Sequence, residues 1–213
     1  MARAVILAVV SAVVTAGAAA YSPTLDLRAI DDAIAIGLAR DAARAQFHRP
    51  YRIPLNRPPF DFIDLVTPFR RMVLLAEERA QAGGRLLQRD ALDALAAHGT
   101  GVQLRVELIF HPQNTYVGVP PYVVRLAEVS SPPHISARGI QLIPRFTPQV
   151  GPPAATPYPA GPVLPSGGQP VLGGLVIADF DAAALDPEGV YDIVVEEGEK
   201  ELVRVAVDLG ALR

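Results

Sequence analysis

The sequence predicts an α+β protein, in which N-terminal helices are followed by a C-terminal antiparallel β-sandwich of about six or seven strands. Two observations lead to this class. Apolar residues recur every three or four positions over much of residues 25–98, which is the period of an α-helix. From Val102 onward the period is two, as in a strand with one buried face. We therefore expect a helical region over residues 21–99 and a β-sandwich over residues 100–213.

Residues 1–20 have the pattern of a secretory signal peptide. Arg3 precedes an apolar run, and Ala18 and Ala20 form an A-x-A cleavage signal. Only one of the 19 basic residues is a lysine, a bias typical of proteins from GC-rich bacterial genomes. We expect cleavage before Tyr21 and a periplasmic or extracellular location. The alternative is an uncleaved N-terminus that tethers the protein to a membrane.

The composition excludes several classes of site. There is no cysteine, so disulfides and cysteine metal ligands are not available. A net charge of −3 does not supply the basic surface that nucleic acids require. Motifs such as H-E-x-x-H and G-x-S-x-G do not occur. We therefore predict no nucleic-acid partner, no cofactor, no metal site and no catalytic residue.

The charges are unevenly distributed along the chain. Residues 40–71 contain seven arginines and three aspartates, whereas residues 175–213 contain ten acidic and three basic residues. One interpretation is that these are two solvated faces, because exposed ion pairs are individually weak. The other is that the two segments dock, within one chain or through self-association.

Three helices are expected in the first half of the chain, over residues 25–47, 67–82 and 86–98. The second is the most strongly marked. Thr67 is a good N-cap because its hydroxyl can accept a hydrogen bond from a free amide of the first turn, and Pro68 suits the first helical position.

Residues 49–60 are rich in proline and arginine. Proline removes backbone donors and favours extended conformations, so no regular helix is expected there. Because apolar residues alternate with the prolines, we interpret the segment as an extended strap packed on the protein rather than a polyproline ligand. It would present three candidate binding residues: Arg49, Arg52 and Arg57.

The second half has strand signals bounded by turn residues. The last two predicted strands should form a hairpin with Gly198 in the turn. Residues 144–172 are interpreted as a long proline-rich loop, and Gly139 as a bulge within a strand. The expected strands cover residues 102–110, 122–129, 135–143, 175–181, 190–196 and 201–209.

Leu185, Pro187, Gly189 and Tyr191 resemble the tyrosine corner of immunoglobulin-like and fibronectin-III-like sandwiches. In those folds the tyrosine hydroxyl bonds to backbone upstream. The resemblance covers about residues 175–209. It implies that the last three predicted strands correspond to strands E, F and G.

The loop over residues 111–122 is the best candidate contact surface. It combines polar and aromatic side chains with three prolines that stiffen it, and rigid loops of this kind lose little entropy on binding. The alternative is that its tyrosines only cover the end of the sandwich. The candidate binding residues of the loop are His111, Asn114, Tyr116 and Tyr122.

These observations favour an exported, non-catalytic interaction or structural protein that binds an envelope protein or a glycan. One alternative is the membrane-tethered accessory protein. The other is a hydrolase assembled from dispersed residues, for which the only candidates are His111, Glu107, and Asp179 or Asp181.

The mass of the intact protein tests the predicted processing. Protein purified from an exporting bacterium should have the mass of a chain that starts at Tyr21, because the A-x-A signal ends at Ala20. A mass that still includes residues 1–20 would contradict cleavage and favour the membrane-tethered alternative.

Overall fold

The structure is a computed structural model that describes residues 21–128, 131–146 and 171–213. Within these ranges the chain forms four α-helices and nine strands, the strands lying in two antiparallel sheets. The expected α+β class is therefore confirmed. The predicted signal peptide and most of the predicted loop 144–172 lie outside the described residues.

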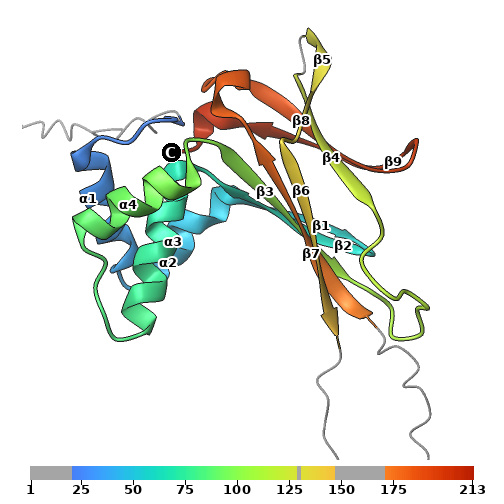
Figure 1. Cartoon of the computed structure of the whole chain (residues 1–213), viewed down its shortest axis with the longest axis horizontal. Coiled ribbons are helices and arrows are strands. Elements are labelled where there is room, and N and C mark those ends of the chain that lie inside the picture. The colour runs from blue at the N-terminus through green and yellow to red at the C-terminus, as the bar shows by residue number, and fades with distance from the viewer. Residues whose placement is uncertain (1–20, 129–130, 147–170) are drawn as a thin grey trace, which may run out of the picture.

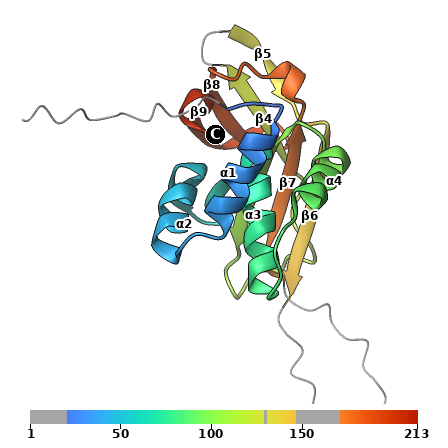
Figure 2. The same ribbon diagram turned by 90° about the vertical axis from the view of Figure 1, so that its left-hand side faces the viewer.

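The helices gather at one end of the sheets (Figures 1 and 2). They are α1 (Leu27–Gly37), α2 (Asp41–His48), α3 (Pro68–Gln81) and α4 (Gln88–His98). The predicted start of α3 is confirmed: the Thr67 hydroxyl accepts a hydrogen bond from the Arg70 amide at 3.2 Å, and Pro68 is the first helical residue.

The single helix expected over residues 25–47 is wrong, because the chain breaks it into α1 and α2. Glycine is a poor helix former, and Gly37 lies where α1 crosses α3 at very short range. A β-carbon at Gly37 would lie 2.6 Å from Ala76 Cβ and 2.7 Å from the Val73 carbonyl oxygen. The chain then turns, and α2 begins after Arg40, whose backbone is extended.

Five strands form one sheet and four form the other (Figure 1). The five-stranded sheet has the order β1 (Arg52–Arg57), β2 (Phe60–Val66), β3 (Val102–Ile109), β7 (Val171–Phe180), β6 (Gly139–Phe146). The four-stranded sheet has the order β5 (Ser131–Ser136), β4 (Tyr122–Glu128), β8 (Val190–Glu197), β9 (Lys200–Asp208).

Two segments differ from expectation. The strand predicted over residues 135–143 is wrong: the chain passes from β5 in one sheet to β6 in the other, and Gly139 begins β6 instead of forming a bulge. Half of the predicted strap is the edge strand β1, which pairs antiparallel with β2. Pro54 is tolerated there because an edge strand has one side without ladder hydrogen bonds.

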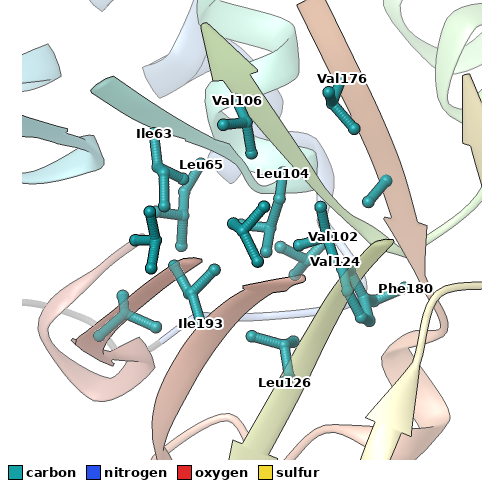
Figure 3. Close-up of a cluster of buried hydrophobic side chains, with 14 of the residues drawn as sticks. Ile63, Leu65, Val102, Leu104, Val106, Val124, Leu126, Val176, Phe180 and Ile193 are labelled. Carbon is teal, nitrogen blue, oxygen red and sulfur yellow. The ribbon is translucent and has the colours of Figure 1, made fainter. Parts of the chain in front are cut away.

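Buried side chains from both sheets form one hydrophobic cluster. Figure 3 shows Leu104, Val124 and Ile193, from β3, β4 and β8, among this group. The alternation predicted after Val102 is confirmed, since inward and outward residues alternate along β3. A second cluster joins α1, α3 and α4, and Phe47 packs against both clusters.

The local geometry around Tyr191 matches the predicted hydrogen bond. The Tyr191 hydroxyl accepts from the Asp186 amide at 2.6 Å. Gly189 is required beside it, because a β-carbon there would lie 2.7 Å from the Tyr191 ring. This corner connects β7 of one sheet to β8 of the other.

Two buried tyrosines predict an alkaline limit to stability. Burial raises the pKa of Tyr21 and of Tyr122 to about 12, above the ordinary value of about 10. A raised pKa in the folded state means that the stabilisation is complete below about pH 10 and is lost as the pH rises toward 12. Denaturant unfolding at increasing pH should show this loss together with late tyrosinate absorbance.

Replacing Tyr21 or Tyr122 with Phe should remove part of the tyrosinate absorbance that develops above about pH 10. Constant stability between pH 10 and pH 12, or ionisation of both side chains near pH 10, would contradict the assignment.

Candidate functional site

An open cavity of about 970 Å³ lies between the helices and the outer face of the five-stranded sheet. We call it the basic groove. Four arginines and two carboxylates line it, so its charged side chains carry a net charge of 4 − 2 = +2. The ionisable residues lining the basic groove are His48, Arg49, Arg52, Asp64, Arg70, Glu77 and Arg105.

Arg70 is the buried centre of this groove, with only 2 % of its side chain exposed. Its Nη2 donates to Asp64 Oδ1 at 2.8 Å, and its Nη1 donates to the Leu65 carbonyl. Its Nε donates to His48 Nδ1 at 3.2 Å, and the guanidinium carbon lies 4.9 Å from the centre of the Tyr51 ring. Burial lowers the pKa of Arg70, and the Asp64 charge opposes that effect. Each part of the guanidinium therefore has a partner.

His48 has both ring nitrogens occupied. Nδ1 accepts from Arg70, and Nε2 lies 2.6 Å from Glu77 Oε1. Because arginine only donates, this network assigns the proton to Nε2, which donates to the Glu77 carboxylate. His48 then has no free nitrogen to accept a proton from a substrate. The Glu77 and His48 pair is arranged as a structural link between α3 and α2.

Arg52 and Arg105 are bonded less strongly to their neighbours than Arg70 is. Arg52 Nε is 3.7 Å from Asp64 Oδ1, and the Arg52 guanidinium covers the Phe62 ring at 4.2 Å. Arg105 Nε donates to the Gln103 side chain at 2.7 Å. In the part of the chain that the structure describes, neither Arg49 nor Arg105 forms an ion pair. The groove can thus offer cationic donors to an anion.

Arg57 lies apart from the other two predicted strap residues. It borders a separate cavity of about 310 Å³ at the turn between β1 and β2, beside Ile109. It is five positions along the strand from Arg52, or about 17 Å. The structure therefore brings Arg49 and Arg52 together and places Arg57 elsewhere.

In the predicted contact loop, Asn114 organises the backbone. Its Nδ2 donates to the carbonyls of His111, at 2.7 Å, and Val171, at 2.9 Å. Its Oδ1 accepts from the Tyr116 amide at 2.9 Å. Tyr116 is 43 % exposed and packs one side of its ring against Phe110. His111 and Tyr116 are therefore accessible, and Asn114 holds the shape of the loop.

Tyr122, which the sequence makes a candidate binding residue of the loop, is buried in the structure. The side chain is 3 % exposed, and its ring centre lies 5.3 Å from that of Phe60. Tyr122 is the first residue of β4 and occupies an inward position of the strand. It belongs to the core and offers little surface to a partner.

Residues 196–201, which we call the acidic tip, connect β8 to β9 and lie beside this loop, since Glu197 is the register partner of Tyr122. The tip contains four glutamates and Lys200. Gly198 has φ = +61°, which suits the tight turn. The sequence indicates the acidic segment and the hairpin, but it does not show that the hairpin lies next to the contact loop.

The structure does not bring together the candidate residues of the hydrolase alternative: His111, Glu107, Asp179 and Asp181. Glu107 forms an ion pair with Arg145 and lies opposite Leu175. Asp179 is four residues along β7 from Leu175, or about 13 Å. No cluster of three or more His, Asp or Glu side chains in the described ranges has the geometry of a metal site.

Comparisons with protein-family models, with curated proteins and with solved structures gave no match. Among the residues described, none of the helices combines the length and apolar character needed to cross a membrane.

Replacing Arg70 tests the buried network. Arg70→Met should lower the free energy of unfolding by about 3–5 kcal/mol, because it leaves the buried Asp64 carboxylate without its main partner. Adding Asp64→Asn to this variant should restore part of the loss, since the uncompensated charge is then removed. Denaturant unfolding monitored by circular dichroism provides the values.

Arg52→Met is the matched control, because it removes the longer and more exposed contact to the same carboxylate. It should cost less than about 1 kcal/mol. Equal losses for the two single variants would contradict the central role of Arg70.

Proposed function

We propose that this chain is an exported, non-catalytic binding protein of the bacterial envelope, which contacts an anionic region of a protein or glycan partner. The observation that carries the proposal is the basic groove. Asp64 is already bound by Arg70, and Glu77 is already bound by His48. Arg49 and Arg105 thus lack carboxylate partners within the described residues.

A binding role is favoured over catalysis by the state of the polar groups. Both nitrogens of His48 are engaged, so the best-placed histidine of the groove has no free acceptor for a substrate proton. Glu107 is paired with Arg145, and Asp179 accepts from the Gln103 side chain at 2.9 Å. These contacts favour structural roles for the candidates of the hydrolase alternative.

A protein surface is favoured over a neutral glycan as the partner. Sugar rings commonly stack on exposed aromatic faces. Phe62, an aromatic side chain beside the groove, is covered by the Arg52 guanidinium at 4.2 Å. Arginines are better suited to carboxylates, which they bind through two parallel hydrogen bonds.

We further propose that the two sheets form an immunoglobulin-like sandwich, with β7, β8 and β9 as strands E, F and G. In such folds strands C, F and G share one sheet and strand E lies in the other. The strand order β4-β8-β9, with β7 in the opposite sheet, supports this proposal. So does the hydrogen bond from the Asp186 amide to the Tyr191 hydroxyl. A fold of this kind implies no activity by itself.

Export is supported by the position of Tyr21. This residue follows the proposed cleavage site directly, is 2 % exposed, and belongs to the hydrophobic cluster between the sheets. Its hydroxyl donates to the Thr100 carbonyl at 3.2 Å. A chain that begins at Tyr21 would therefore keep this buried residue and the hydrophobic cluster of the described residues.

Capture from envelope extracts tests the function. Immobilised protein should retain a cross-linkable partner, and Arg49→Glu should weaken this retention about tenfold, because it reverses a charge in the groove. Replacing Asn114 and Tyr116 with Ala should also reduce retention, and unchanged retention would exclude the loop as a contact surface. Melting temperatures measured in parallel would exclude unfolding as the cause.

Arg79→Glu is the matched control, since Arg79 is an exposed arginine in the last turn of α3 and does not line the groove. It changes the net charge by the same amount. Equal retention by Arg49→Glu and Arg79→Glu would exclude the groove as the binding site.

A further inference from the structure

We propose that the basic groove of one copy binds the acidic tip of a second copy, so that the protein assembles head to tail. This inference rests on the proposed binding role of the groove and names its partner. It is carried by two surfaces of opposite charge on one chain, each with side chains that lack a partner of opposite charge within the described residues.

The acidic tip has two glutamates available for a partner. Glu196 is paired with Arg125 at 3.2 Å, and Glu201 is paired with Arg204 at 2.6 Å. Glu197 and Glu199 are exposed and form no ion pair in the described ranges of the chain. β8 and β9 are paired along a long antiparallel ladder, which holds the backbone of the tip in place.

The groove presents arginines that can pair with these glutamates. Arg49 and Arg105 lack carboxylate partners, and Arg52 is only weakly engaged with Asp64 at 3.7 Å. The groove wall behind them is fixed by Arg70, because each of its guanidinium nitrogens donates a hydrogen bond. Because the backbone on both sides is already held in place, association orders mainly side chains, and the opposite charges favour the contact.

The contact is not made within one copy. In the described residues, no ion pair joins the basic segment 40–71 to the acidic segment 175–213. Figure 1 shows the turn between β8 and β9 at the end of the sheets away from the helices, whereas the groove lies against α2 and α3. The two surfaces therefore point in different directions and are available to different neighbours.

An interface between two different surfaces of the same chain is heterologous. Each copy then has one groove and one tip to offer, and repeated contacts produce rows or closed rings. The contact depends on exposed charges, so it should be strong at low ionic strength and weak in high salt. A row of this kind would give a structural role at the cell surface its chemical basis.

Sedimentation velocity over a wide concentration range tests the assembly. We expect the average mass of the purified protein to rise with concentration in low salt and to fall to that of one chain in high salt. Arg49→Glu and Glu197→Arg should each weaken association about tenfold. Mixing the two variants should restore association, because each reversed residue then meets a complementary one.

Arg79→Glu and Glu188→Arg are the matched controls, since both residues are exposed and neither belongs to the groove or the tip. They should associate like the unmodified protein. A single-chain mass at every concentration would overturn the inference, as would association that Arg49→Glu and Glu197→Arg leave unchanged. If retention of an envelope partner still depended on Arg49 in that case, the proposed function would stand and only the identity of the partner would be wrong.

Discussion

The structure depends on the buried guanidinium of Arg70. Removing an arginine from water is costly unless each of its donors finds a partner. Arg70 meets this condition by donating to Asp64 and Leu65 at the end of β2 and to His48 at the end of α2. Since Arg70 itself belongs to α3, a single side chain ties two helices to the five-stranded sheet.

Tyr51 extends this junction to the end of the described chain. Its ring lies under the Arg70 guanidinium, and its hydroxyl donates to the Arg213 carbonyl at 2.9 Å. The Thr67 hydroxyl donates to the same carbonyl at 2.6 Å. The segment after β9 is thus held against the start of α3. The groove owes its shape to this junction, because its floor cannot shift without breaking several buried hydrogen bonds.

Several features follow from the sequence alone. The cap and first turn of α3 are encoded by Thr67 and Pro68, and the alternation after Val102 identifies both the strand and its buried face. The hairpin around Gly198 is equally local. In these cases a few neighbouring residues determine the conformation, so the sequence pattern is enough to predict it.

Other features depend on contacts between distant segments. The end of α1 at Gly37 follows from close packing against α3, which is about 40 positions later in the chain. The passage from β5 to β6 depends on which sheet each half joins, and a continuous apolar pattern does not encode that choice. In the sequence, Tyr122 follows two prolines of a polar loop, where aromatic side chains are often exposed. In the structure it is the first residue of β4, and its side chain is buried.

The candidate site was foreseen only in part. The proline-rich segment makes Arg49 and Arg52 candidate binding residues, and both line the groove. Arg70 and His48 gave no signal, since an arginine in a helix and a lone histidine are usually solvated. Arg105 is an outward residue of β3, and only the pairing of β2 with β3 brings it to the groove.

Cross-linking with a carbodiimide, which joins a carboxylate to an amine without a spacer, tests the account most directly. The chain has one lysine, Lys200, and it lies in the acidic tip. In a mixture of isotopically light and heavy protein, the account predicts links from Lys200 of one copy to Glu77, which lines the groove of another. Links from Lys200 only to glutamates of its own hairpin would contradict it.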